Sequence, residues 1–261
     1  MLQIRKRYKG LRWNTIYFAT EENSESEKNS DIVEYNYMLM TKGEPVIDDD
    51  IIEFDTLITD LQKNKNDIFD NFEKNTKYEI RRAGRENIDV FCYDWTMSSE
   101  KLEKIISFYN GFVDTKEDLT FKLSAKWLEP YIDEKSFWCT VAYLDGQQLV
   151  EHIYYGDGKR VRLWYSASLF RNSDRNMRNT IGRANRFLHW QDILYFKERG
   201  FEVYDWGGYS DEGAVAGNGA FKKAFGGSSE KGICYLKAGS PLGAIALKMR
   251  RCLLYLKNIR I

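Results

Sequence analysis

Apolar and polar residues alternate along two segments near the N-terminus, a pattern typical of half-buried β-strands. The first segment covers residues 11–18 and the second covers residues 33–40. Between residues 57 and 83 the apolar spacing becomes helical, and the remaining positions are heavily charged. These patterns predict a small sheet followed by a long charged helix.

The next elements come in an informative order. A strand is expected over residues 88–95, and Ser98 can cap a helix whose apolar residues follow the spacing i, i+3, i+4, i+7. A second helix is predicted over residues 124–131. Three strands joined by short glycine-containing turns follow, which predicts an antiparallel meander: 136–143, 148–155 and 160–168.

The last third of the chain returns to helices and short strands. A long helix is predicted over residues 181–199, and Gly200 is placed to end it. The elements expected after it are a strand (202–206), a glycine-rich stretch (207–219) and a short helix that ends at two glycines (221–227). A last strand (233–237) and an amphipathic helix (241–261) follow.

The composition is that of a folded chain. Of 261 residues, 43% are hydrophobic and 15% aromatic, which excludes a chain that is disordered throughout. The length suits one large domain or two small ones. We predict an N-terminal part over residues 1–86, a main domain over 87–240, and a separate basic amphipathic helix over 241–261.

Nothing in the sequence resembles a signal peptide or a membrane span. The basic residues 5–7 are not followed by an apolar run, and the uncharged stretch 238–247 is about half as long as a span needs to be. Four scattered cysteines lack metal-site spacing, which favours thiols in a reducing compartment. We therefore expect a cytoplasmic protein.

Charge is balanced over the whole chain but unevenly spread. Residues 20–60 hold thirteen acids and two lysines, whereas residues 159–186 hold eight basic residues and one acid. Residues 231–261 hold seven basic residues and no acid. The basic segments predict an anionic small-molecule or precursor substrate. A net charge of zero argues against binding of duplex DNA.

Four short motifs, in this order, resemble the Fem-type branch of the GNAT acyltransferase superfamily: residues 75–85, 184–190, 204–209 and 221–227. The resemblance covers roughly residues 54–237. It implies an α+β GNAT-like fold, a mixed and mostly antiparallel sheet flanked by helices, in which the last meander strand splays from its neighbour and the acyl donor lies in the gap. Fem enzymes carry two such domains, so this chain would hold one complete copy and a reduced N-terminal subdomain.

Lys222 is the first candidate for the chemistry. The lysine of the matching Phe-Lys pair is implicated in catalysis in the Fem family, and here it follows a glycine-rich loop. Its neighbour Lys223 could act instead. Asp205 ends a predicted strand and could take a proton or hold the acceptor, or could simply cap a turn. Three residues after it are expected to contact substrate: Gly207, Gly208 and Tyr209.

Two further groups are predicted to hold anionic parts of the substrates. Gly182, Arg183 and Ala184 would open the long helix, where free N–H groups and nearby Arg178 suit coenzyme A diphosphate or a tRNA end.

Arg81 and Arg82 could grip an acceptor phosphate or complement their helix dipole. Tyr165 and Ser166 end the meander strand, where the fold's backbone N–H polarises the donor carbonyl.

The two histidines, His152 and His189, are more often structural than catalytic in such positions. The sequence contains no readable Ser-His-Asp or Cys-His arrangement, so a covalent acyl-enzyme is not expected. We predict no metal and no tightly bound cofactor, and either acyl-CoA or aminoacyl-tRNA as co-substrate.

The predicted function is transfer of an acyl or aminoacyl group to an amine of a cell-envelope precursor, such as a nucleotide-sugar or a peptidoglycan or polysaccharide intermediate. The alternative is a non-catalytic binding module of the same fold. The C-terminal basic helix could in either case hold the protein at the inner face of the membrane.

Overall fold

A computed structural model of the chain describes residues 1–20, 27–39, 51–117, 119–209 and 216–258. The chain forms two compact units, residues Met1–Asp55 with Glu230–Ile261 (unit 1) and residues Thr56–Ser229 (unit 2). Strands β4 (Ile52–Asp60) and β10 (Ser228–Ala238) each begin in one unit and end in the other.

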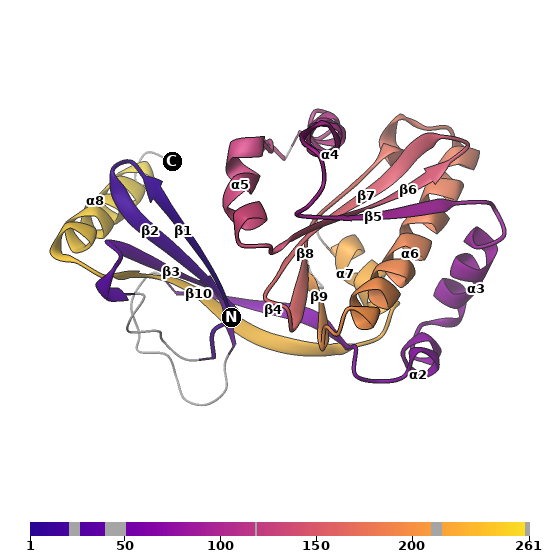
Figure 1. Cartoon of the computed structure of the whole chain (residues 1–261), viewed down its shortest axis with the longest axis horizontal. Coiled ribbons are helices and arrows are strands. Elements are labelled where there is room, and N and C mark those ends of the chain that lie inside the picture. The colour runs from indigo at the N-terminus through magenta and orange to yellow at the C-terminus, as the bar shows by residue number, and fades with distance from the viewer. Residues whose placement is uncertain (21–26, 40–50, 118, 210–215, 259–261) are drawn as a thin grey trace. The chain divides into compact units, whose positions relative to one another are not determined.

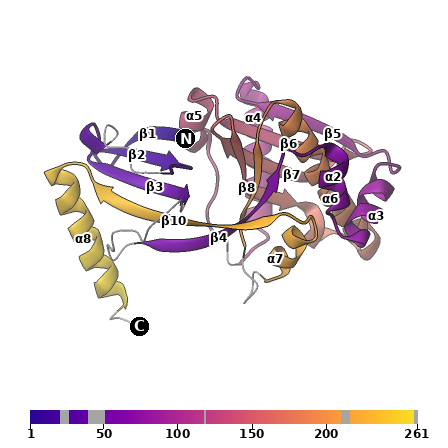
Figure 2. The same ribbon diagram turned by 90° about the horizontal axis from the view of Figure 1, so that it is seen from below.

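Unit 1 is built on four neighbouring strands. An antiparallel hairpin, β1 (Leu2–Tyr8) and β2 (Leu11–Tyr17), turns through two residues with positive φ, as such tight hairpins require. Strand β2 runs parallel to β3 (Ile32–Leu39), and β3 pairs antiparallel with β10. Figure 2 shows these strands side by side, and helix α8 (Pro241–Asn258) follows β10 directly.

Unit 2 contains the predicted succession of elements. A six-strand sheet has the order β4-β9-β8-β7-β6-β5 and is antiparallel except between β8 and β9. Its strands beyond β4 are β5 (Asp89–Asp94), β6 (Phe137–Leu144), β7 (Gln147–Gly156), β8 (Arg160–Ser168) and β9 (Val203–Gly208). Its helices are α2 (Lys65–Asp70), α3 (Lys74–Ala83), α4 (Ser99–Val113), α5 (Ala125–Asp133), η1 (Leu169–Asn172), α6 (Arg175–Glu198) and α7 (Ala216–Lys223).

Helices cover both faces of this sheet. The ring of Tyr109 of α4 packs at a tilt against that of Tyr165 of β8, with ring centroids 4.8 Å apart. On the opposite face, His152 of β7 bonds to residues of α6. The α+β fold with a mostly antiparallel sheet flanked by helices is therefore confirmed (Figure 1).

Two parts of the N-terminal half differ from the expectation. The segment 57–83 is not one helix: β4 continues to Asp60, and the Asn64 side chain caps a new helix by accepting from two backbone N–H groups. The compact units also divide the chain at other positions than 86 and 240, because β3 pairs with β10 and so joins the two ends of the chain in unit 1. Parts of three predicted segments, residue 40, residues 210–215 and residues 259–261, lie outside the described residues.

The core of unit 2 is rich in aromatic side chains. Trp206 and Phe225 lie fully buried with ring centroids 4.6 Å apart, and Phe72 packs on Phe225 at 5.1 Å. Burial of each such ring stabilises the fold by roughly 1.5–3 kcal/mol. This packing fixes α7 against β9 and α6.

Gly227→Ala should destabilise the protein by about 2–4 kcal/mol. Gly227 has φ +98°, and a Cβ there would lie 2.5 Å from the Ile58 carbonyl oxygen of β4. Gly146 also has positive φ, +77°, but no atom lies within 4 Å of its Cβ position, so Gly146→Ala should cost only about 1 kcal/mol. Urea unfolding of the two variants measures the difference in their free energies of unfolding. Equal losses of stability would show that the close approach of Gly227 to β4 contributes nothing.

Candidate active site

Strands β8 and β9 form a fork. Their parallel ladder covers only Arg160–Arg162 against Val203–Asp205, although both strands continue beyond it. At the point of separation Gly207 has φ +78°, and a Cβ there would lie 3.1 Å from the Leu163 carbonyl oxygen. A side chain at position 207 would therefore crowd the Leu163 carbonyl oxygen, and the positive φ there also favours glycine.

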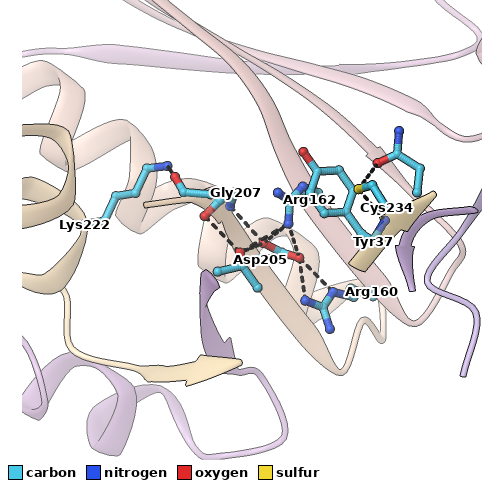
Figure 3. A network of polar contacts seen from close by, with 10 residues as sticks. Tyr37, Arg160, Arg162, Asp205, Gly207, Lys222 and Cys234 are labelled. Carbon is cyan, nitrogen blue, oxygen red and sulfur yellow. Dashed lines mark hydrogen bonds and ion pairs between the residues drawn. The ribbon is translucent and has the colours of Figure 1, made fainter. Parts of the chain in front are cut away.

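The base of the fork is held by the fully buried carboxylate of Asp205 (Figure 3). Its Oδ2 accepts hydrogen bonds from Arg160 Nε at 2.9 Å and Nη2 at 2.5 Å. Arg162 Nη1 lies 2.8 Å from both carboxylate oxygens. Oδ1 also accepts from the Thr56 hydroxyl at 2.5 Å and from the Gly207 backbone N–H at 2.8 Å.

These contacts assign Asp205 a positioning role. Burial alone would raise the pKa of its carboxyl, but the charges of Arg162 and Arg160 and the hydrogen bonds lower that pKa below its usual value. A buried carboxylate with a lowered pKa and no free lone pair is a poor base. The predicted direct contact of Asp205 with an amine or an acceptor therefore does not fit its surroundings.

Lys222 of α7 reaches the same fork from the side of β9. Its Nζ donates to the Gly208 carbonyl oxygen at 2.8 Å and would lie 3.6 Å from a Cβ on Gly207. Burial and the nearby charge of Arg162 lower its pKa to about 8, against a smaller opposite effect of Asp205. The structure thus brings three predicted site residues together: Lys222, Gly207 and Gly208.

Helix α6 lines the same region through Arg186. The guanidinium of Arg186 lies over the Phe221 ring at 5.0 Å and donates to the Gly182 carbonyl oxygen at 3.1 Å. Desolvation lowers the pKa of Arg186, and among the described residues its buried Nε has no acceptor. Arg186 therefore contacts both Gly182 and Phe221, the residue before Lys222.

The predicted phosphate site at a helix N-terminus needs correction. Helix α6 begins at Arg175, where the Asp174 side chain accepts from the Met177 N–H at 2.9 Å. Gly182, Arg183 and Ala184 consequently lie inside the helix, where the backbone N–H groups bond within it. They offer no free N–H to a phosphate.

The side chains of that predicted site are also engaged elsewhere. Arg183 is buried and its Nε donates to Glu86 at 2.8 Å, while Ala184 is part of the core. Arg178 is exposed and its guanidinium lies 5.8 Å from the centroid of the Phe170 ring. Of the four residues, Arg178 alone remains on the surface with a charge that a ligand could reach.

The remaining predicted substrate residues are spread over unit 2. Tyr165 is half-buried and stacks on Trp164 at 5.0 Å, and Ser166 is exposed at the end of β8. The Tyr209 hydroxyl bonds to Ser229 at 3.0 Å, and Lys223 Nζ lies 5.2 Å from the Tyr209 ring centroid.

Arg81 and Arg82 end helix α3. Arg81 lies 5.2 Å from the centroid of the Phe69 ring, and Arg82 forms an ion pair with Glu86 at 3.1 Å. Nothing in these contacts assigns the pair to an acceptor phosphate, so their dipole role stays the simpler interpretation.

Behind the fork, a buried polar cluster joins β7, β9 and α6. The Tyr154 hydroxyl donates to Asp192 Oδ2 at 2.6 Å and lies 2.8 Å from the Tyr204 hydroxyl. The Tyr204 hydroxyl lies 2.9 Å from His189 Nδ1, and His152 Nδ1 lies 2.7 Å from Asp192 Oδ2. His152 Nε2 also lies 2.7 Å from Asn185 Oδ1.

Counting protons fixes the direction of these bonds. Tyr154 has one proton and gives it to Asp192, so Tyr204 must donate to Tyr154. His189 must then donate from Nδ1 to Tyr204. Burial holds the pKa of His189 well below its usual value, so its ring is neutral and the lone pair lies on Nε2.

The same cluster is where a metal ion could be sought. His152, His189 and Asp192 offer ligand atoms within 4.8 Å of one another. Both ring nitrogens of His152 and one of His189 are already used in hydrogen bonds, so an ion would have to replace them. We therefore interpret the cluster as a hydrogen-bonded network and assign no ion to it.

A cavity of about 240 Å³ opens beside the far end of β8. The second half of α4, including Gly111, lines one side, and Ser168 and Arg171 line the other. Its walls are mainly apolar with a few polar groups, which suits a small organic group.

Arg160, Arg162 and Arg186 were not among the predicted site residues. The first two alternate with Val161, so they share one face of β8, and the register places Arg162 opposite Asp205. Buried cations at alternate strand positions are rare without a partner, which is a signal that the sequence contained.

Neither a protein-family model nor a curated protein matches the sequence. Solved structures do match. The structure of FemX has a TM-score of 0.63 and 14% identity, covering 90% of this chain and 84% of that one. The C-terminal domain of a putative lysylphosphatidylglycerol synthetase from Agrobacterium fabrum has a TM-score of 0.54 and 11% identity, covering 97% and 88%.

The structure of L-PGS from Bacillus licheniformis has a TM-score of 0.52 and 13% identity, covering 86% of this chain and 80% of that one. These similarities confirm the resemblance at the level of the fold. The chain shares the fold of FemX and of these two structures.

Proposed function

We propose that the protein transfers an acyl or aminoacyl group from an activated donor, acyl-CoA or aminoacyl-tRNA, to an amine of a cell-envelope precursor. A nucleotide-sugar or a peptidoglycan or polysaccharide intermediate is the acceptor class we favour. The observation that carries the proposal is the position of Lys222, whose Nζ lies at the backbone of Gly207 and Gly208 where β8 and β9 part.

Acyl transfer to an amine creates a negative charge on the reacting carbonyl oxygen and releases a leaving group that needs a proton. A lysine ammonium can meet both demands when its pKa lies near the working pH. The pKa of about 8 at Lys222 keeps the group mostly protonated at pH 7 and still able to give up a proton.

The electrostatics of the fork favour an anion. Asp205 carries one negative charge, while Arg160, Arg162 and Lys222 together carry three positive charges. Because this surplus lies in a largely desolvated region, it acts on a nearby oxyanion more strongly than it would in water. The same surplus suits a carbonyl oxygen that becomes negative during the reaction.

Arg186 is the side chain best placed for a phosphate of the donor. Its guanidinium lies over the ring of Phe221, the residue before Lys222, and its buried Nε has no acceptor among the described residues. A phosphate oxygen would supply that acceptor. The name of one similar structure describes a putative lysylphosphatidylglycerol synthetase, which supports an aminoacyl donor.

Donor consumption tests the proposal without knowledge of the acceptor. Purified protein is incubated with acetyl-CoA or with a set of charged tRNAs, alone and with an amino-sugar nucleotide, and release of thiol or deacylated tRNA is followed. Acceleration of either release by the acceptor supports transfer. Calorimetric binding of the acceptor without binding or consumption of any donor would favour the non-catalytic module.

Lys222→Ala should lower kcat by about 10²–10⁴-fold, because it removes the cation at the fork. The matched control is Lys223→Ala, which removes the adjacent lysine beside the Tyr209 ring and should change kcat by less than about threefold. Full activity of the Lys222 variant, with circular dichroism showing an intact fold, would remove this role.

The pH dependence of kcat should reflect the same group. If protonated Lys222 is required, kcat falls as pH rises through about 8. In Lys222→Arg any residual activity should not decline there, because a guanidinium stays charged. A decline that is identical in the wild type and the Arg variant would place the titrating group elsewhere.

Asp205→Asn should destabilise the protein by about 3–5 kcal/mol, because it leaves two buried guanidinium groups without their counter-charge. The pKa of Asp205 is lowered in the folded state, so its contribution is present above the unfolded pKa and is lost as pH falls through the folded one. Chemical unfolding from pH 7 downward should show a shallower acid dependence in the variant. A stability unchanged at pH 7 would contradict the positioning role.

A further inference from the structure

Helix α8 of unit 1 has one face docked on its own unit. Gly243 and Leu247 are buried, and a Cβ on Gly243 would lie 1.6 Å from the Asp31 carbonyl oxygen. The helix start is also tied to Asp31, because the Ser240 hydroxyl donates to its Oδ1 at 2.8 Å and accepts from the Gly243 N–H at 3.1 Å. The orientation of α8 about its axis is therefore fixed.

A second, exposed face of α8 is apolar. Leu242, Ile245 and Met249 are 55%, 59% and 62% exposed, and their spacing of three and four residues places them in one stripe along the helix. Cys252, also exposed, continues the stripe three residues on. Large side chains exposed in a row are uncommon in a surface that meets only water.

Basic residues flank this stripe on both sides. Lys248 and Arg250, both exposed, precede and follow Met249 and so lie about 100° round the helix on either side of it. Arg251 adds a third positive charge, and the sequence from residue 231 to the end contains no acid. Basic side chains beside an apolar stripe place their charges at the level of anionic lipid headgroups while the stripe enters the acyl boundary.

We propose that this face of α8, Leu242, Ile245, Met249 and Cys252 with Lys248 and Arg250, binds the surface of an anionic lipid bilayer. Charge complementarity selects that occupant. None of the described helices is long and apolar enough to cross a membrane, so the contact lies in the interfacial plane. The inference does not depend on the proposed chemistry, which belongs to unit 2.

Vesicle sedimentation tests the proposal on the full chain. Phosphatidylcholine vesicles with about 30 mol% phosphatidylglycerol should bind the protein at least about tenfold more tightly than pure phosphatidylcholine vesicles. Binding should weaken as salt is raised, because the headgroup charge is screened. Equal binding to both vesicles, or to neither, would overturn the proposal.

Two variants test the apolar stripe and the basic residues beside it separately. Leu242→Gln/Ile245→Gln/Met249→Gln should lose about tenfold or more of the vesicle affinity, and Lys248→Gln/Arg250→Gln should abolish the preference for phosphatidylglycerol. The matched control, Lys63→Gln/Lys65→Gln in exposed positions of unit 2, should change neither. If the triple variant instead turns a dimer into a monomer in lipid-free light scattering, a second copy covers the stripe and the proposal fails.

Cys252 offers a direct measurement. It is the exposed cysteine, whereas Cys139 is buried and Cys92 and Cys234 are partly buried. A polarity-sensitive label on Cys252 should shift its emission to the blue when anionic vesicles are added. The shift should disappear in Cys252→Ser protein treated with the same reagent. An unshifted spectrum on vesicle-bound protein would show that another surface makes the contact.

Discussion

The buried carboxylate of Asp205 is the contact on which the geometry of the site depends. It holds two guanidinium groups, Arg160 and Arg162, at the last residues where β8 and β9 still pair. It also accepts a hydrogen bond from the N–H of Gly207, which is the first residue after the ladder with a positive φ. The Asp205 side chain thus lies at the end of the ladder and neutralises part of the charge of the two arginines. It also holds the backbone segment to which Lys222 donates its hydrogen bond.

The reactivity of Lys222 follows from this arrangement. A lysine in water has a pKa far above neutral pH and would be a poor proton donor to a leaving group. Burial and the charge of Arg162 bring its pKa down to about 8, while the carboxylate of Asp205 limits the fall. A larger fall would leave the group neutral at pH 7 and remove the cation. The pKa therefore depends on burial and on the balance between the charges of Arg162 and Asp205.

Much of the fold was predictable from the sequence, because local signals agreed with one another. The Ser98 cap is an example: its hydroxyl accepts from the Lys101 N–H as a capping residue should. The start of α6 was misplaced because polar residues 175–180 hid a helix whose cap, Asp174, lies before them. The motif at position 222 predicted a lysine that the structure places beside Gly207 and Gly208. The partners of Asp205 come from strands distant in the sequence, and no local pattern specifies such a register.

The position of Gly207 shows how the fork and the charge cluster depend on each other. Strands that separate lose ladder hydrogen bonds, and the freed backbone groups need other partners. Here the Gly207 N–H bonds to Asp205, and the Gly208 carbonyl oxygen accepts from Lys222. The groups that satisfy the open strand end are therefore the same groups that supply its charge. A fork lined by apolar residues would leave those backbone groups unsatisfied, so opening the sheet at this point itself favours a polar, cationic site.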